Sequence, residues 1–400
     1  MARGRAAWKR ALDSKLYLTR AMLRLERSAP SLTSAIGYHA ILGPPSRFDW
    51  LSESRVLTRM TQAPYAEEFH ALSVANVDAP TWHLGHPGHS LEGGASHFGP
   101  LQPLEVRRLA SLVPDVIVPG HNLLPVDAAT GRLLAFYGST EVNWGIAYPG
   151  LSRLKRERLK GAAWAIPPVK NYFHLLVEHI LPVVDMLLTE RAGLAGSQVT
   201  VITQGNLPLL DAIATILKRL GIAIAFEKAR PFVTYAPEQY LFCKPVAASV
   251  EHFYAYPDAV GVLREAFGGQ ASASLPSRLY VPRTGTRIRR LIGEPELIAQ
   301  LAEHGFSSFT AHRDNPEEQI ARFMAAREIV SVHGAALTNI VWAAPGARVV
   351  EIFPSNARKT TYLHMASLHD HAYAHVSGGS ENERQDFAVD PAAVLRVLGL

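Results

Sequence analysis

The segment Ser331-Val-His-Gly-Ala-Ala-Leu-Thr-Asn339 has the pattern of a buried strand that turns directly into a helix. The apolar run from Glu328 predicts the strand, and the small residues after His333 and Gly334 predict a helix over 335–344. Backbone N–H groups at a helix start point outward and, with the helix dipole, attract anions. A glycine at this place also serves a tight turn that needs only small residues. The segment therefore predicts either a phosphate site or a sterically tight turn.

The same alternation of strand and helix extends to both sides of this segment. Apolar runs predict strands over 278–282, 306–310, 348–353 and 372–376, and helical spacing predicts helices over 294–304, 316–327, 359–368 and from Pro391 onward. Such alternation is typical of a parallel sheet whose strands are joined by crossover helices.

A second series of alternating elements precedes a Gly/Ser/Ala-rich interruption at 268–277. It comprises predicted helices over 172–188 and 207–220 and predicted strands over 198–203, 222–226 and 240–243. Residues 30–150 are rich in Gly, Pro and His and lack helical periodicity, which favours a β-rich region. We therefore divide the chain into an N-terminal segment 1–29, a β-rich region 30–150, a first Rossmann-like lobe 151–272 and a second Rossmann-like lobe 273–400.

Composition and charge limit the classes of protein. The chain has 400 residues, of which 48% are hydrophobic, and carries a net charge of +5. This length predicts two or three domains, and the charge suits nucleic acid, anionic lipid or a phosphate-bearing substrate. No recognition helix or RNA-binding motif is present, so we expect no nucleic-acid partner. The single cysteine and the lack of a long apolar run or signal peptide lead us to expect a cytoplasmic protein.

The segment 1–29 concentrates positive charge. Its basic residues and interspersed apolar residues predict a basic amphipathic helix. Such a helix lies peripherally on an anionic membrane or packs on its own domain, and the sequence leaves both possibilities open.

Two charged residues stand at predicted strand ends. Arg283 follows the strand 278–282, and a guanidinium at such a place suits the bidentate geometry of a phosphate. Glu351 lies inside an apolar strand, where a carboxylate requires a partner. We expect that partner to be a nearby arginine or the hydroxyl pair of a ligand such as a ribose.

Four separated segments resemble glycosyltransferase family 61: Asn171-Tyr-Phe-His174, Tyr280-x-x-Arg283 with Arg289-Arg290, His333-Gly-Ala-Ala-Leu-Thr-Asn339, and Val350-Glu-Ile-Phe-Pro354. The resemblance covers roughly residues 165–360. It implies a GT-B-like α/β fold of two facing Rossmann-like lobes, with the acceptor on the first lobe and a nucleotide-sugar on the second. It also implies an inverting transfer that needs no metal and no cofactor beyond the donor.

The resemblance also implies site residues. On the donor side we expect Arg283, Arg290, His333, Gly334, Ala335, Thr338, Asn339 and Glu351. On the acceptor side we expect Asn171. We expect a UDP-sugar donor, a glycan or glycolipid acceptor, and a role in capsule or other surface polysaccharide biosynthesis at the inner membrane face.

The predicted helix 172–188 offers candidates for the catalytic base. His174 and Glu178 are four residues apart and share a helix face, and Asp185 lies on nearly the same face. Either His174 or Glu178 is the base, or Glu178 only orients His174, or both are structural.

Two other classes compete with a transferase. A catalytically silent nucleotide-sugar or glycan-binding module would keep Arg283, His333 and Glu351 but lack a base. A zinc hydrolase would use His174, Glu178 and His179 as ligands, but its usual motif places two histidines four residues apart, whereas these are five apart. We therefore expect no metal site.

Overall fold

The computed structural model describes residues 70–74, 104–128, 155–189, 198–268 and 274–400, apart from short gaps within these ranges. The predicted helix in 1–29 lies outside the described residues. The same holds for most of the region 30–150, of which only the segments carrying four strands are described.

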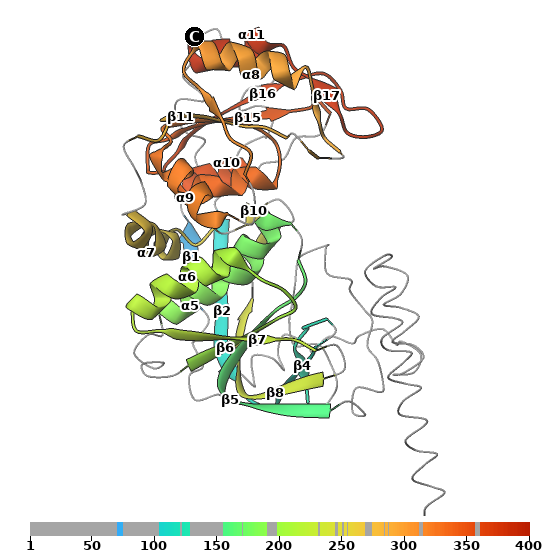
Figure 1. Ribbon diagram of the computed structural model, residues 1–400, viewed down its shortest axis with the longest axis vertical. Helices are drawn as coiled ribbons and strands as arrows, with labels where there is room; N and C mark the ends of the chain where they lie inside the picture. Colours follow the sequence, from blue (N-terminus) through green and yellow to red (C-terminus); the bar gives the residue numbers. More distant parts are fainter. Residues whose placement is uncertain are drawn as a thin grey trace, which may run out of the picture.

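The C-terminal lobe is built on a five-stranded parallel sheet in the order β13-β11-β14-β15-β16 (Figure 1). The strands are β11 (Arg278–Val281), β13 (Ser307–Ser308), β14 (Glu328–Val332), β15 (Arg348–Phe353) and β16 (Ala372–Ser377). In chain order this is 2-1-3-4-5, so the connections leave β11 and β14 in opposite directions across the sheet. Doubly wound sheets bind ligands at the carboxyl ends of the strands at such a reversal.

Helices cover both faces of this sheet. Those on the outer side are α8 (Glu294–Glu303) and α11 (Pro391–Leu398), and those toward the N-terminal lobe are α9 (Pro316–Ala325), the 3₁₀-helix η5 (Ala335–Trp342) and α10 (Thr361–Leu368) (Figure 1). The predicted strands and helices of this lobe are confirmed, except that 335–342 forms a 3₁₀-helix. The short parallel pair β12 (Leu291–Ile292) and β17 (Phe387–Ala388) was not predicted, because two residues carry no periodicity.

The N-terminal lobe contains an eight-stranded mixed sheet. Its parallel part has the order β7-β6-β5-β8 and comprises β5 (Lys155–Ile166), β6 (Gln198–Thr203), β7 (Ala223–Lys228) and β8 (Val233–Lys244). Antiparallel strands complete it: β1 (His70–Val74), β2 (Leu104–Val113), β3 (Val116–Pro119) and β4 (Val126–Asp127). The strand order reverses between β5 and β8, which creates a second switch point. A mixed α/β fold with parallel sheets is therefore confirmed.

Two long strands of this lobe exceed what the sequence predicted. The first half of β5 is charged and partly exposed, and only Ala162–Ile166 is buried, so β5 lacks the continuous apolar run expected of a central strand. Only 240–243 of β8 was predicted, because Pro237 interrupts its upstream half. The pairing of β5 with β8 shifts register between Leu159 and Ala162, at Gly161 with its positive φ of 69°.

Helices lie between the two lobes. The π-helix η3 (His174–Ile180) continues into α5 (Leu181–Thr189), and α6 (Pro208–Arg219) and α7 (Pro257–Phe267) contact α9 and η5 of the other lobe. A small ribbon of β9 (Ala247–Ser249) and β10 (His252–Phe253) contacts α10. One apolar cluster runs through this layer and includes Leu210, Phe267, Phe323 and Trp342. The two lobes therefore share a core. Within the described residues, no helix is long and apolar enough to cross a membrane.

Candidate active site

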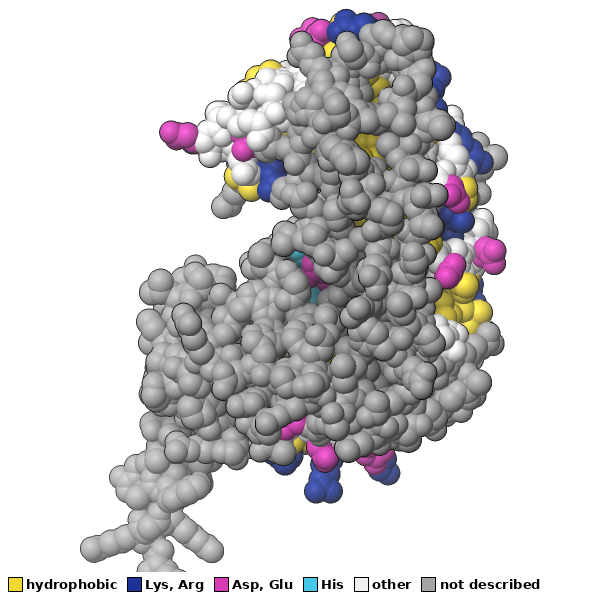
Figure 2. Space-filling model, turned by 180° about the vertical axis from the view of Figure 1, so that it is seen from behind, with side chains coloured by type: hydrophobic (Ala, Val, Ile, Leu, Met, Phe, Trp, Pro, Cys, Tyr) yellow, Lys and Arg dark blue, Asp and Glu magenta, His cyan; other side chains and the backbone are white. Residues whose placement is uncertain are grey.

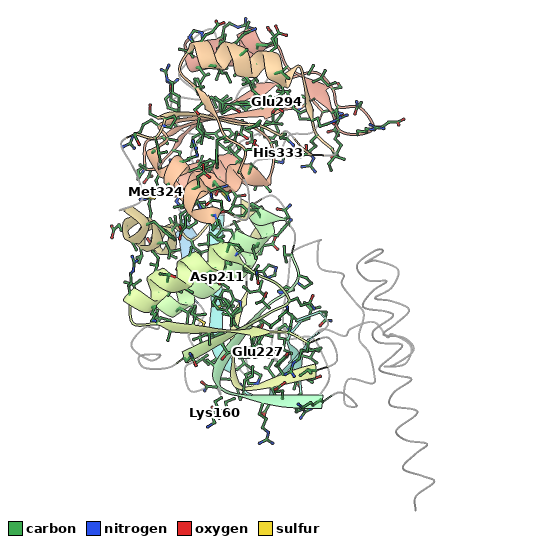
Figure 3. All side chains as sticks on the ribbon, in the orientation of Figure 1. Lys160, Asp211, Glu227, Glu294, Met324 and His333 are labelled. Atoms are coloured by element: carbon green, nitrogen blue, oxygen red, sulfur yellow. The ribbon has the colours of Figure 1, made fainter. Side chains whose placement is uncertain are left out.

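The carboxyl ends of β11 and β14 bring three candidate residues together. Arg283 follows β11, and His333 and Gly334 follow β14, the neighbouring strand at the switch point of the C-terminal sheet. His333 lies on the side of the sheet toward the N-terminal lobe, with Glu294 on the side away from it (Figure 3). The sequence placed these residues at the ends of two predicted strands but did not predict that the two strands are neighbours.

Arg283 is a partly buried cation held by oxygen atoms that carry no full charge. Its Nη1 donates to the His333 carbonyl oxygen at 2.8 Å and its Nη2 to the Ile288 carbonyl oxygen at 3.2 Å. Its Nε is buried and has no hydrogen-bond partner among the described residues. Burial lowers the pKa of the guanidinium below its usual value, and the nearby Arg289 adds to the lowering. Among the residues that the structure describes, no carboxylate forms an ion pair with the guanidinium, and a desolvated cation of this kind is costly, so this position favours an anionic ligand.

The backbone around Arg283 is fixed by Glu294. Its Oε1 accepts hydrogen bonds from the Arg283 backbone N–H and from the Tyr280 hydroxyl, each at 2.8 Å. Glu294 is buried at the start of α8, so its carboxylate ties the end of β11 to the outer helix layer. Glu294 therefore fixes the backbone from which the Arg283 side chain extends.

Gly334 permits the Arg283 guanidinium to lie against the strand-to-helix turn. A Cβ at this position would overlap Nη1 of Arg283. The backbone of Gly334, with φ 166° and ψ 171°, is extended and within reach of any residue. The glycine is thus required for close approach rather than for an unusual backbone conformation.

A hydrogen-bonded chain of three side chains lies behind His333. The His333 Nδ1 contacts Glu351 Oε1 at 2.5 Å, and the Tyr373 hydroxyl donates to Glu351 Oε2 at 2.5 Å. Because a carboxylate only accepts hydrogen bonds, His333 carries its hydrogen on Nδ1, and Nε2 is the ring nitrogen that Glu351 does not bind. Burial and the Glu351 carboxylate raise the pKa of Tyr373 well above its usual value.

This arrangement corrects the expected partner of Glu351. Glu351 is fully buried, and its two oxygens are bonded to His333 and Tyr373 rather than to an arginine or an open ligand site. The carboxylate therefore orients His333, and the role of Glu351 in donor binding stays a prediction.

Aromatic rings connect His333 to the N-terminal lobe. His333 stacks on Phe353 with ring centroids 5.1 Å apart and meets the edge of Tyr362 at 5.4 Å. Tyr362 contacts Phe173 at 6.1 Å, and Phe173 contacts His174 at 5.4 Å. His174 and His333 thus lie at the same interlobe junction, joined by two rings.

The N-terminal lobe contributes a second histidine–glutamate pair. His174 Nδ1 lies 2.6 Å from Glu178 Oε1, with the histidine side chain 18% exposed and the glutamate side chain fully buried. Both belong to the π-helix η3, which follows β5, the first strand of the switch point in this lobe. The carboxylate accepts a hydrogen bond from Nδ1 of His174, so the hydrogen of the neutral ring lies on that nitrogen. π-Helical turns are frequent at functional sites.

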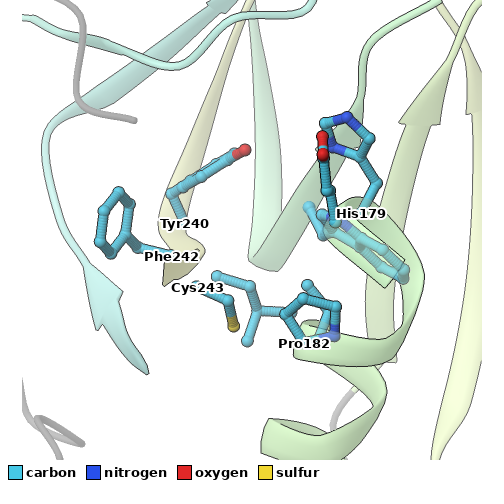
Figure 4. A pocket seen from close by; sticks show the side chains of 9 residues that line it. His179, Pro182, Tyr240, Phe242 and Cys243 are labelled. Carbon is cyan, nitrogen blue, oxygen red and sulfur yellow. The ribbon is translucent and has the colours of Figure 1, made fainter. Parts of the chain in front are cut away.

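A small cavity lies behind this pair. It has a volume of about 10 Å³ and is lined by Glu178 and His179 of η3 and, across the gap, by Tyr240, Phe242 and Cys243 of β8 (Figure 4). Glu178 Oε2 is buried and has no hydrogen-bond partner among the described residues. Burial lowers the pKa of His179 to about 3, with a contribution from His174. His179 is thus neutral near pH 7.

Two of the residues expected to bind the donor have side chains that are buried in the protein interior. Thr338 and Asn339 are fully buried. The Thr338 hydroxyl contacts the Tyr362 hydroxyl at 3.4 Å, and the Asn339 amide is occupied by protein groups. Both side chains are thus bonded within the protein, and their role in donor binding stays a prediction.

Arg290 is held by an acidic partner. Its Nε and Nη2 donate to Asp386 Oδ2 at 3.0 Å and 2.6 Å, and the side chain is 52% exposed. Its role in donor binding stays a prediction. Ala335 is half-buried at the start of η5, directly after Gly334, and its role also stays a prediction.

The remaining candidates lie on the helix that bears His174. Asn171 caps the helix, since its Oδ1 accepts from the Phe173 backbone N–H at 2.9 Å. Asp185 is buried eleven residues beyond His174, roughly 16.5 Å along the helix at about 1.5 Å per residue. Asp185 is therefore not grouped with His174 and Glu178.

The opposite side of the molecule shows the surface of this junction. Figure 2 shows a hollow between the two lobes with histidine and acidic side chains at its floor. Among the described residues, no group of three or more His, Cys, Asp or Glu side chains is arranged to hold a metal ion.

The comparisons with known proteins identify the class. Residues 172–350 match the family model described as Glycosyltransferase 61. The protein is a glycosyltransferase. The matched region contains Arg283, His333 and the pair His174–Glu178 but ends just before Glu351, and it confirms the resemblance to family 61 seen in the sequence.

Two solved structures are similar over part of the chain. E. coli heptosyltransferase WaaC with ADP has 9% identity and a TM-score of 0.33, covering 60% of this chain and 97% of that chain. The E. coli ADP-heptose LPS heptosyltransferase II has 11% identity and a TM-score of 0.31, with the same coverage of both chains. No curated protein matches the sequence.

Several residues of the site were missed by sequence reasoning. They are Tyr373, Tyr362, Phe173, Phe353 and Glu294. Each looks like an ordinary core or helix-start residue in the sequence. A signal existed only for Tyr373, because β16 pairs with β15 and a tyrosine in that strand supplies a hydroxyl near the buried Glu351.

Proposed function

We propose that the protein transfers a sugar from a nucleotide-sugar, with a UDP-sugar as the first candidate, to a glycan or glycolipid acceptor with inversion at the anomeric carbon. The observation that carries this proposal is Arg283, a desolvated cation with an unpaired Nε beside the Gly334 turn. Its position at the switch point of a doubly wound sheet suits the diphosphate of such a donor.

The donor side would act on the leaving group. As the bond between the anomeric carbon and the diphosphate oxygen breaks, negative charge develops on that oxygen. Arg283 is held within reach of the turn by its bond to the His333 carbonyl, so its charge is already oriented when the bond breaks. The backbone N–H groups that follow Gly334 would add hydrogen bonds to the phosphate.

His174 is the proposed base. The acceptor hydroxyl oxygen forms the new bond to the anomeric carbon, and its proton passes to His174 Nε2. Glu178 holds the opposite nitrogen at 2.6 Å and stabilises the imidazolium that forms. The hydrogen bond and the buried position of Glu178 support this role, which is the same as that of the carboxylate in a Ser-His-Asp triad.

The wider setting is also a proposal. We propose a GT-B arrangement, with the lobe 273–400 on the donor side and the lobe 151–272 on the acceptor side, and a transfer that requires no metal. We further propose a cytoplasmic enzyme of surface polysaccharide biosynthesis, such as capsule formation, whose segment 1–29 contacts the anionic inner membrane face. The charge of that segment supports this contact.

The test combines binding and turnover. Melting temperatures of the wild type, Arg283→Ala and the control Arg396→Ala are measured with UDP, GDP, CMP and their sugar conjugates. Arg396 is exposed on α11, so its loss changes the net charge equally without touching the site. One nucleotide series should raise the melting temperature of the wild type and the control but not that of Arg283→Ala.

Turnover then separates an enzyme from a binding module. With the donor identified, transfer to a panel of glycan and glycolipid acceptors should be lost in His174→Ala while donor binding remains. Donor binding without transfer or donor hydrolysis in the wild type would instead support a catalytically silent module. No response to any nucleotide would refute the proposed donor site.

A further inference from the structure

A buried polar cluster joins the two lobes close to both histidine–glutamate pairs. We call it the interlobe polar cluster, and it consists of Tyr172, Gln319, Asn339 and Trp342. Asn339 and Trp342 are fully buried, and Gln319 is 2% exposed. These polar groups lie in a layer that is otherwise the shared apolar core.

Tyr172 and Asn339 form a hydrogen bond that crosses between the lobes, as does the bond from Arg264 Nη1 to the Ala343 carbonyl oxygen at 3.0 Å. The Tyr172 hydroxyl donates to Asn339 Oδ1 at 2.9 Å and accepts from Trp342 Nε1 at 3.5 Å. The Asn339 Nδ2 donates to Gln319 Oε1 at 3.2 Å and to the Ala336 carbonyl oxygen at 3.0 Å. The three polar side-chain atoms of the pair, Tyr172 Oη and Asn339 Oδ1 and Nδ2, thus all have partners.

The two residues lie on the same short elements as the site residues. Tyr172 stands at the start of the helical segment that contains His174, two residues further on. Asn339 lies in η5, whose first residue follows Gly334. A bond between Tyr172 and Asn339 therefore relates the position of His174 to that of the Gly334 turn.

Apolar contact alone does not determine this relation. The hydrophobic effect is non-directional and roughly proportional to buried area, so a helix that slides by a fraction of a turn keeps most of its stabilisation. A buried hydroxyl and a buried amide must be paired, and unpaired groups are penalised. The observed register pairs the Tyr172 hydroxyl with the Asn339 amide, so a shift of one helix against the other breaks this bond.

Resting on the proposed function, we propose that Tyr172 and Asn339 are positioning residues that fix the register of the His174 helix against the Gly334 turn. The pair would set the distance from the base to the donor sugar without touching either substrate. Misplacement of reacting groups by about 1 Å can lower a rate by about 10²-fold. The effect should therefore fall on kcat, while the affinity for the donor, which is bound by the C-terminal lobe, changes little.

The test uses Tyr172→Phe, Asn339→Leu and the double variant. Tyr172→Phe removes one oxygen and keeps the ring packing. The control is Tyr235→Phe, because the Tyr235 hydroxyl is likewise hydrogen-bonded but lies in the N-terminal sheet; Tyr235 is fully buried, whereas Tyr172 is half-buried. Melting temperature, the donor dissociation constant and kcat of the folded enzyme are measured for each variant.

The double variant separates positioning from stabilisation. Replacing both partners by apolar groups can restore stability, because no buried group of the pair is left unpaired. We expect kcat of Tyr172→Phe to fall by about 10- to 100-fold with the donor dissociation constant changed by less than about threefold, and kcat of the double variant to stay low. Wild-type kcat in Tyr172→Phe, or recovery of kcat in the double variant, would overturn the proposal.

A second readout does not depend on turnover. Spin labels at Lys218→Cys on α6 and Ala299→Cys on α8, both exposed, in a Cys243→Ser background report the distance between the lobes. The distance distribution should be narrow in the wild type and broader or shifted in Tyr172→Phe. An unchanged distance distribution in Tyr172→Phe would contradict the proposal that this pair fixes the register of the two helices. That result would hold whether or not the wild type transfers sugar, whereas a wild type without transfer would refute only the proposed function.

Discussion

Replacing Gly334 with alanine tests whether the close approach of Arg283 to the strand-to-helix turn matters for donor binding. The added methyl group would overlap Nη1 of Arg283, and the atom that must move is the far end of a flexible side chain. The extended backbone of Gly334 accepts alanine without strain. We therefore expect the melting temperature to change little, because the fold can accommodate the methyl by displacing the guanidinium.

The cost should appear in the affinity for the donor. Displacement removes the 2.8 Å bond from Arg283 to the His333 carbonyl and turns the guanidinium away from the phosphate position. A hydrogen bond to a charged group contributes about 1.5–3 kcal/mol. At about 1.4 kcal/mol per factor of ten, the donor dissociation constant should rise by about 10- to 100-fold.

Calorimetric titration of the nucleotide identified in the melting screen measures this change. The matched control is Gly261→Ala in α7, where a Cβ meets open space, so binding should stay at the wild-type level. In an Arg283→Ala background, Gly334→Ala should cause no further loss of affinity, because the overlapping group is absent. Wild-type affinity in Gly334→Ala, or an equal additional loss in the Arg283→Ala background, would refute the reasoning.

Three further predictions concern buried polar groups. Burial lowers the pKa of His179 and His369 to about 3 and that of His371 to about 4. Since the folded protein binds these protons less readily than the unfolded chain, the free energy of unfolding should fall between pH 6.5 and pH 4, by up to about 1 kcal/mol per pH unit for each histidine. Urea unfolding at several pH values measures this, and a flat profile contradicts it. Tyr373→Phe leaves Glu351 Oε2 buried without its donor and should lower the free energy of unfolding by about 1–3 kcal/mol in the same assay, whereas a loss below about 0.5 kcal/mol would contradict the bond. Finally, the cavity of about 10 Å³ is large enough for one water, and a high-resolution crystal structure should show a water bonded to Glu178 Oε2; an empty cavity would contradict this.

The fold of the C-terminal lobe was largely predictable, because its strands are short apolar runs and its helices have clear periodicity. The N-terminal lobe was less so. The first half of β5 is charged because it is partly exposed, and Pro237 interrupts β8, so neither strand has the pattern of a buried one. Strand order could not be read from the chain, since it depends on which distant strands pair.

The candidate site divides in the same way. The pair His174 and Glu178 was predictable from its spacing on one helix, and its hydrogen bond is observed. The partner of Glu351 was not, because the histidine and the tyrosine that bind it come from two neighbouring strands. Asn339 was placed on the donor side because it shares a motif with Gly334, but its amide turns toward the other lobe.

The apolar cluster that passes through α6, α7, α9 and η5 also bears on how the chain folds. Leu210 and Phe267 precede the glycine-rich interruption at 268–277, and Phe323 and Trp342 follow it, yet they belong to one cluster. Cutting the chain at that interruption would expose an apolar face on each fragment, and such faces favour aggregation. We therefore expect the two lobes to fold as a single cooperative unit, and the lobe 273–400, proposed to bind the donor, to depend for its solubility on the lobe 151–272, proposed to supply the base.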